Sequence, residues 1–141
     1  MKKILLLTAA LVSTTVSAAG SDGCETLYLR LVNNTGASCI LRDASVYGGG
    51  IIVDGVPQEI PNNSISPRFR VKQGSLIGAI IRLDYQCGNK RAILNTTQSY
   101  CFLSAGNISG DAEGEGRLAS YLATPGSYWN ASPGQITWIL N

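Results

Sequence analysis

The residues best suited to chemistry fall into three short patterns, of which the first is basic. Arg68, Arg70 and Lys72 alternate with Phe69 and Val71, which predicts a short strand with three cations facing outward. Arginine binds phosphate, sulfate and lipid headgroups bidentately, so this stripe could hold such an anion. A solvated strand face that blocks aggregation explains the same pattern.

The second pattern is aromatic. Tyr128 and Trp129 stand between the turns Pro125-Gly126 and Ser132-Pro133-Gly134. Aromatic residues presented on a loop are typical of binding to glycans, membrane interfaces or proteins. The alternative is that one or both rings fold back over the core.

The third pattern is acidic. Asp111, Glu113 and Glu115 alternate before Gly116, as at the start of a calcium loop. An EF-hand loop needs a bidentate glutamate at its twelfth position, and Leu122 stands there. The pattern therefore predicts a solvated acidic loop, with weak calcium binding as the alternative. We expect no other metal and no cofactor.

Catalytic patterns are missing from the sequence. The chain has no histidine, the usual base of serine and cysteine hydrolases, and no Gly-x-Ser-x-Gly elbow. A carboxylate pair such as Asp84 with Asp54 or Glu59 could hydrolyse glycosides, so a small hydrolase remains an alternative. An inhibitor that inserts a rigid loop into a foreign enzyme is another. We expect a binding protein that is not an enzyme.

The start of the chain predicts export. Met1-Lys2-Lys3 is a basic segment, Ile4 to Val12 is apolar, and Val16-Ser17-Ala18 is a small-residue cleavage site. This is a bacterial-style signal peptide over residues 1–18, too short to span a membrane. Residues 19–141 are then a single domain, secreted or periplasmic. No later apolar stretch is long enough for a spanning helix.

Charge and cysteine content narrow the partners further. Lys2 and Lys3 account for the whole formal excess of +2, so the mature chain is neutral and has no field that attracts nucleic acid. Four cysteines in an exported chain predict two disulfides, and without histidine or a Cys-x-x-Cys pair zinc is disfavoured. The four are Cys24, Cys39, Cys87 and Cys101.

The elements that must position these residues are short strands. Ile81 to Cys87 alternates apolar and polar residues, a turn follows at Gly88-Asn89-Lys90, and a second apolar run leads to Cys101. We interpret these as a central strand pair that serves as scaffold. Leu27, Leu29 and Leu31 form the inner face of an earlier strand.

Two further hairpins are predicted. Glu25 to Val32 and Ala37 to Val46 would pair across a turn, which sets Cys24 and Cys39 at opposite ends and disfavours a bridge between them. Asp54-Gly55 predicts a tight turn after Ile51-Ile52-Val53. The segment Ala105 to Gly116 is expected to be an exposed loop.

The C-terminal region completes the predicted fold. Leu118 to Ala123 suits a helical turn or a strand, and Ile136, Trp138 and Leu140 share one face of a final strand. About eight short strands without a helical pattern indicate an all-β fold. We expect a single antiparallel β-sandwich, or small barrel, stapled by two disulfides.

The chain resembles the aegerolysins. The likeness consists of an apolar strand running into Val32-Asn33-Asn34-Thr35-Gly36, a glycine-rich break, Ser64-Ile65-Ser66-Pro67 and a strand-rich remainder. It implies a small β-sandwich that recognises membrane lipids, in some members together with a pore-forming partner. No binding residue is transferred from the family.

The sequence thus predicts a secreted bacterial binding or effector module that contacts a host or envelope surface made of protein, glycan or lipid. The contacts would come from Tyr128, Trp129 and the basic stripe. A lipid-binding aegerolysin-like protein is the nearest alternative.

Overall fold

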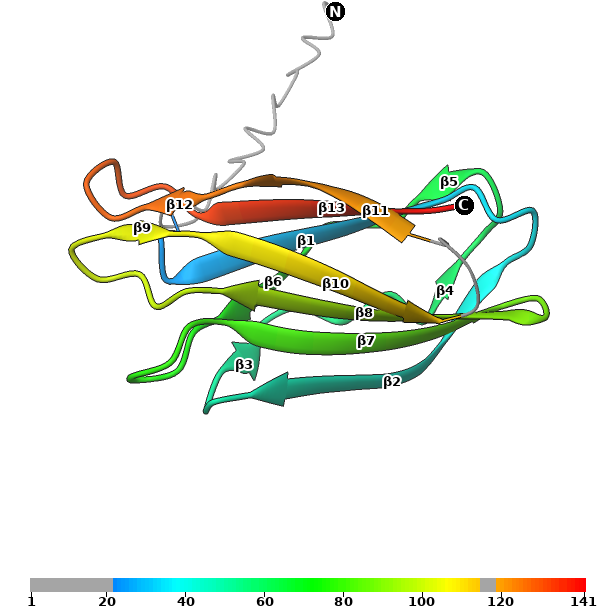
Figure 1. Ribbon diagram of the computed structural model, residues 1–141, viewed down its shortest axis with the longest axis horizontal. Coiled ribbons are helices and arrows are strands. Elements are labelled where there is room, and N and C mark those ends of the chain that lie inside the picture. The colour runs from blue at the N-terminus through cyan, green and yellow to red at the C-terminus, as the bar shows by residue number, and fades with distance from the viewer. Residues whose placement is uncertain (1–21, 115–118) are drawn as a thin grey trace, which may run out of the picture.

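The computed structural model describes residues 22–114 and 119–141, which form two β-sheets packed face to face (Figure 1). The predicted signal peptide, residues 1–18, lies outside the described residues. The first sheet has the strand order β11-β13-β1-β6-β3, and β5 also pairs with β1. Its strands are β1 (Thr26–Asn33), β3 (Ile51–Ile52), β5 (Ser64–Ile65), β6 (Phe69–Lys72), β11 (Ala119–Thr124) and β13 (Gly134–Leu140).

The second sheet has the order β10-β8-β7-β2-β4, and a separate pair joins β9 to β12 at one end of the sandwich. These strands are β2 (Cys39–Tyr47), β4 (Glu59–Ile60), β7 (Ile80–Cys87), β8 (Lys90–Gln98), β9 (Ala105–Gly106), β10 (Ile108–Gly114) and β12 (Gly126–Ser127).

The predicted β-sandwich is confirmed, but the described residues contain thirteen strands instead of about eight. Most of the excess consists of two-residue strands such as β3, β4 and β5, which are too short to show any alternation in sequence. The sandwich is also not wholly antiparallel. The first strand β1 runs parallel to the last, β13, with Leu29 opposite Ile136.

The core lies between the sheets and uses the inner faces that alternation predicted. Every residue named for the faces of β1, β7 and β13 is buried, as are Phe69 and Val71 of β6. Two polar side chains of this core have specific partners. The Trp138 Nε1–H group donates to Thr96 Oγ1 at 2.9 Å, and the Tyr85 hydroxyl donates to the Pro57 carbonyl at 2.7 Å. The inner-face residues are Leu27, Leu29, Leu31, Ile81, Leu83, Tyr85, Ile136, Trp138 and Leu140.

The central strand pair is confirmed, whereas the two other predicted hairpins are wrong. β7 and β8 pair along their whole length, from Ile80 opposite Thr97 to Cys87 opposite Lys90. β1 and β2, however, belong to different sheets, because the chain between them crosses the sandwich. The strands that flank Asp54-Gly55 separate in the same way, since β3 pairs with β6 and β4 pairs with β2.

The segment predicted as an exposed loop, residues 105–116, is also wrong where it is described. It forms β9 and β10, and β10 pairs with β8 from Ile108 to Gly114. Gly110 serves close packing here, because a Cβ atom at this position would lie 2.7 Å from the Trp138 ring. Of the two states predicted for Leu118 to Ala123, the strand is present as β11, and Leu118 lies outside the described residues.

Two disulfides close the fold, and all four cysteines are paired. Cys24 precedes β1 and Cys101 follows β8, so their bridge ties the two sheets together. Cys39 and Cys87 lie directly opposite each other on β2 and β7. The expectation that Cys24 does not pair with Cys39 is confirmed, although the hairpin from which it was reasoned is absent.

Candidate functional site

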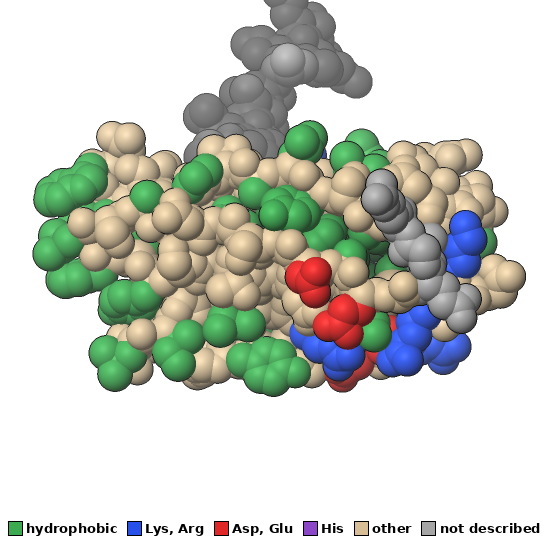
Figure 2. Space-filling model, viewed as in Figure 1, with side chains coloured by type: hydrophobic (Ala, Val, Ile, Leu, Met, Phe, Trp, Pro, Cys, Tyr) green, Lys and Arg blue, Asp and Glu red, His purple; other side chains and the backbone are tan. Residues whose placement is uncertain are grey.

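Exposed apolar side chains gather at one end of the sandwich, on the left in Figure 2. The strand register brings the loops of one sheet together here, because Tyr47 of β2, Ile80 of β7 and Thr97 of β8 lie side by side at this end of their strands. On the other sheet, β1 and β13 both begin here, with Leu27 opposite Gly134. Four loops therefore project together, at residues 47–50, 73–79, 99–104 and 128–133. We call their exposed side chains the apolar end: Tyr47, Leu76, Ile77, Tyr100, Phe102, Leu103, Tyr128 and Trp129.

The predicted aromatic pair is part of this end and does not fold back over the core. Trp129 is 74% exposed and Tyr128 is 37% exposed. The rings form a chain of contacts, with centroids 5.4 Å apart for Tyr128 and Trp129 and 5.6 Å for Phe102 and Tyr128. Tyr100 extends the chain at 6.5 Å from Phe102. The rings from two loops thus form one continuous aromatic surface.

Specific contacts fix the loops beneath this surface. The Gln73 side chain accepts from the Cys101 amide at 2.9 Å and donates to the Cys101 carbonyl at 3.3 Å, which joins the loop at 73–79 to the loop at 99–104. Cys101 is itself bonded to Cys24. Ile77 lies directly against Gly48, so the loop at 73–79 also contacts the loop at 47–50. Loops usually move more than the strands they connect, but these contacts preorganise the apolar side chains.

Two apolar-end loops also carry backbone strain. Leu103 has a φ of 56° and Ala131 a φ of 46°, in the left-handed region that side chains with a Cβ rarely adopt. Such strain persists only where the surroundings hold it, and it concentrates at binding sites.

Charged residues are absent from the four apolar-end loops, as the sequence of these segments shows. Glu25 and Lys72 are the charged residues at the edge of the apolar end. Gln73, which follows Lys72, donates its backbone amide to the Glu25 carbonyl at 2.9 Å. Figure 2 shows the charged side chains of the visible face gathered on the half away from this end. The end is therefore neutral as well as apolar.

The basic stripe is divided by the fold into three different environments. Arg70 lies between two carboxylates, with Nε 2.7 Å from Asp54 and Nη1 3.0 Å from Asp22. These hydrogen bonds raise the pKa of Arg70, and the bond from Arg70 lowers the pKa of Asp54. Arg68 instead stacks on the ring of Tyr28, with its Cζ 4.4 Å from the centroid. The charge of Arg70 is thus already compensated within the protein.

Lys72 stands apart from both arginines, at the end of β6 beside the apolar-end loop that begins at Gln73. The three cations share a strand face, but they do not form a single anion site.

The acidic pattern lies on a strand rather than in a loop. Asp111 and Glu113 alternate along β10, and Glu113 accepts a hydrogen bond from Asn95 at 2.8 Å. Glu115 lies outside the described residues. Among residues 22–114 and 119–141, no three acidic or sulfur ligands come together at a spacing suited to a metal ion.

Two of the three carboxylates considered for hydrolysis, Asp84 and Asp54, are bound to arginines. Asp84 is buried on β7 and accepts two hydrogen bonds from Arg91, which lower its pKa. Asp54 is similarly bound to Arg70. A general acid needs a raised pKa, so neither environment prepares these groups to protonate a leaving group.

In the described part of the chain, no helix is long and apolar enough to cross a membrane.

Comparison with solved structures finds two proteins of similar fold. The lipid-binding protein Nakanori superposes with a TM-score of 0.63 at 9% identity, covering 82% of this chain and 70% of that chain. RahU, solved in complex with a TRIS molecule, superposes with a TM-score of 0.53 at 8% identity, covering 83% of this chain and 96% of that chain. Both are aegerolysin-family β-sandwich proteins. The predicted resemblance to aegerolysins is therefore confirmed at the level of the fold.

Sequence comparison adds nothing to this, since no protein-family model and no curated protein matches the chain.

Sequence reasoning found two of the apolar-end residues and missed the others. Leu76 and Ile77 were assigned to no site, and they lie in the loop before β7, which begins at Ile80. Phe102 and Leu103 received no role. The available signal was their setting, because uncharged segments rich in glycine, serine and large apolar residues recur between predicted strands. Only the fold shows that these segments meet at one end.

Proposed function

We propose that this protein is a non-catalytic module that binds the surface of lipid membranes, with the apolar end entering the interface. The observation that carries the proposal is the cluster of large, solvent-exposed aromatic and aliphatic side chains on four uncharged loops. Soluble proteins rarely leave such a contiguous apolar surface uncovered unless it binds something.

The composition of the apolar end favours a membrane over a protein or glycan partner. Tryptophan and tyrosine concentrate where bilayers meet water, because their rings are apolar and their polar atoms reach water. Leu76 is 84% exposed and Trp129 is 74% exposed, so both side chains project far enough to enter lipid. Burying one such side chain is worth about 1.5 to 3 kcal/mol. A few of them suffice for reversible binding without covalent anchoring.

The neutral loops define the kind of attraction. Without charge at the apolar end, binding depends on apolar burial and not on anionic headgroups. We therefore expect binding to uncharged vesicles, with little loss as salt rises from about 50 to 500 mM, because screening acts only on charges.

The disulfides support a location outside the cytoplasm. Two buried bridges with no free cysteine suit an oxidising compartment. The predicted bacterial-style signal peptide over residues 1–18 leads to the same place. The target would then be an envelope or host membrane reached from outside the cytoplasm, and the relation of the fold to lipid-binding Nakanori agrees with this.

Co-sedimentation with phosphatidylcholine vesicles tests the proposal. We expect Trp129→Ala and Phe102→Ala each to weaken vesicle binding about tenfold, because each removes one large side chain that would be buried in the membrane. Ile65→Ala is the matched control. Ile65 is 62% exposed on β5, at the opposite end of the sandwich (Figure 1), and its loss should leave binding unchanged. Equal binding by all three variants would refute the role of the apolar end.

A further inference from the structure

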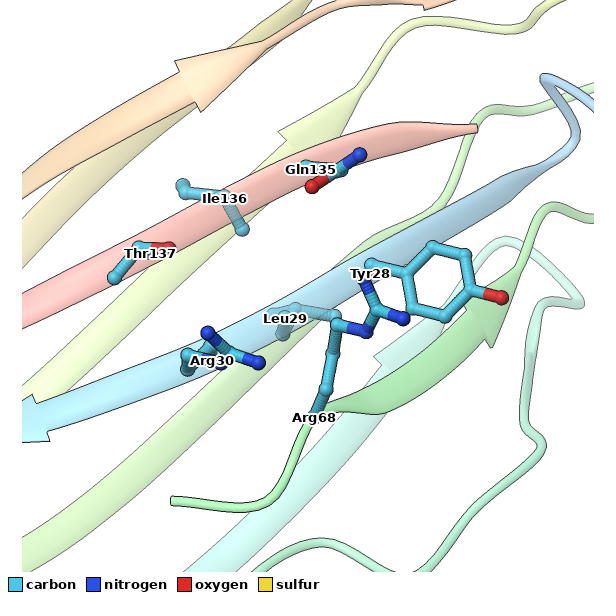
Figure 3. A pocket seen from close by; sticks show the side chains of 7 residues that line it. All are labelled: Tyr28, Leu29, Arg30, Arg68, Gln135, Ile136 and Thr137. Carbon is cyan, nitrogen blue, oxygen red and sulfur yellow. The ribbon is translucent and has the colours of Figure 1, made fainter. Parts of the chain in front are cut away.

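A shallow depression lies on the outer face of the first sheet, and two arginines line it (Figure 3). Its volume is about 50 Å³. Pockets for drug-sized ligands span roughly 300 to 1,000 Å³, so this one suits a single small group. Its lining residues are Tyr28, Leu29, Arg30, Arg68, Gln135, Ile136 and Thr137.

The sheet register brings the two arginines together. Leu29 of β1 lies opposite Phe69 of β6 and points into the core, so the flanking Arg30 and Arg68 come next to each other on the outer face. On the other side of β1, Thr137 of β13 lies directly opposite Arg30. Arg30, Arg68 and Thr137 therefore occupy neighbouring positions on the outer face of three adjacent strands.

Arg68 is held in position by a cation–π contact and, within the described residues, not by an ion pair. Its guanidinium lies 4.4 Å above the Tyr28 ring, and the Tyr28 hydroxyl donates to Asp22. That carboxylate also accepts a hydrogen bond from Arg70, at 3.0 Å. A chain of contacts therefore fixes the platform on which Arg68 rests.

Neither Arg30 nor Arg68 has an acidic partner among the described residues, whereas Arg70 and Arg91 do. Like charges on neighbouring strands repel each other, which disfavours the fold as it stands. A bound anion would remove this repulsion. The Gln135 amide and the Thr137 hydroxyl, both in the lining, supply neutral donors beside the cations.

We infer that this depression binds a phosphate group through Arg30 and Arg68, with Gln135 and Thr137 as additional donors. Guanidinium groups match the oxygens of a phosphate bidentately, and two of them balance its charge. A lipid headgroup and a soluble phosphate ion present the same oxygens, so the site accepts either source. This site does not depend on the proposed function of the apolar end.

Titration with inorganic phosphate in the absence of membranes tests the inference. In ¹H–¹⁵N spectra of arginine side chains, the Arg30 and Arg68 Nε–H signals should shift on addition of phosphate. Arg30→Gln and Arg68→Gln should each weaken the phosphate affinity about tenfold or more, since each removes charge-assisted hydrogen bonds. Arg42→Gln is the matched control, an exposed arginine on β2 of the other sheet, and should have no effect. The absence of shifts, or an equal loss in all three variants, overturns the inference.

Vesicles distinguish the two sources of the phosphate. If the source is a lipid, adding phosphatidic acid to phosphatidylcholine vesicles strengthens binding of the wild type and not of Arg30→Gln. If the source is soluble, phosphatidic acid has the same effect on both proteins while phosphate titration still separates them. Trp129→Ala should bind phosphate like the wild type, so failure of the apolar end and failure of this site are told apart.

Discussion

The bridge between Cys24 and Cys101 should be needed both for stability and for the geometry of the apolar end. It closes a sequence separation of 77 residues, for which the chain-entropy relation gives about 4.5 kcal/mol of stabilisation. The bridge between Cys39 and Cys87 closes 48 residues and gives about 4 kcal/mol. Replacing either pair by serine should therefore lower the free energy of unfolding by similar amounts.

The two double variants should differ in membrane binding. Cys101 lies in the loop that presents Tyr100, Phe102 and Leu103, whereas Cys39 and Cys87 sit on adjacent strands. Without its bridge, the loop at 99–104 is held at Cys101 by the hydrogen bonds to Gln73 and at Ser99 by those to Asn107. The part around Phe102 must then become ordered on the membrane. Ordering one residue costs about 1 to 2 kcal/mol. Vesicle affinity should then fall about five- to thirtyfold.

Urea unfolding and vesicle co-sedimentation of both double variants provide the assay, under conditions where each remains folded. Cys24→Ser/Cys101→Ser should lose stability and vesicle affinity. Cys39→Ser/Cys87→Ser should lose stability alone. If the second variant loses as much affinity as the first, the reasoning that one bridge organises the apolar end is refuted.

Three further predictions concern the scaffold. Arg91 lowers the pKa of Asp84 below its usual value of 3.8, so this pair stabilises the fold above that pH, and its contribution is lost as the pH falls through the lowered pKa. Asp84→Asn should therefore lower the free energy of unfolding by about 1.5 to 3 kcal/mol at pH 7, and by progressively less when urea unfolding is repeated at acid pH. A difference that does not change with pH would contradict this. Tyr85→Phe leaves the Pro57 carbonyl without its 2.7 Å donor and should cost about 1 to 3 kcal/mol by urea unfolding, whereas unchanged stability would show that water replaces the bond. Gly110→Val places side-chain atoms against the Trp138 and Tyr121 rings and should lower the free energy of unfolding by about 1 to 3 kcal/mol; a stable variant with an unchanged near-UV spectrum would contradict the packing.

The sequence predicted the scaffold because alternation reports burial directly. Leu27, Leu29 and Leu31 are buried because a half-buried strand must alternate, and the β7–β8 pair followed from the same rule and one turn. Strand partners were harder to predict. The turn at Asp54-Gly55 has the local chemistry of a hairpin, but its flanking strands join different sheets, a choice made by tertiary packing.

In the candidate sites too, residues with a local sequence signal could be predicted, and residues that only the fold brings together could not. Trp129 was recognisable because a tryptophan between two turns is conspicuous, whereas Phe102 joins it only through the meeting of two loops. Arg68 was likewise visible within a basic stripe. Its partner Arg30 belongs to a different strand, 38 positions earlier in the chain, and no local pattern connects the two. The ion pairs of Arg70 with Asp54 and Asp22 were equally invisible in the sequence, because the fold alone brings these residues together.

Tryptophan fluorescence tests the central claim most directly, because the chain has two tryptophans in opposite environments. Trp129 is 74% exposed at the apolar end, and Trp138 is 1% exposed in the core. With phosphatidylcholine vesicles, the emission of the wild type should shift to shorter wavelength and be quenched by lipids brominated on their acyl chains. Trp129→Phe, which keeps only Trp138, should show neither change. A wild-type spectrum that vesicles leave unaltered, or a response that persists in Trp129→Phe, would contradict insertion of the apolar end into the membrane.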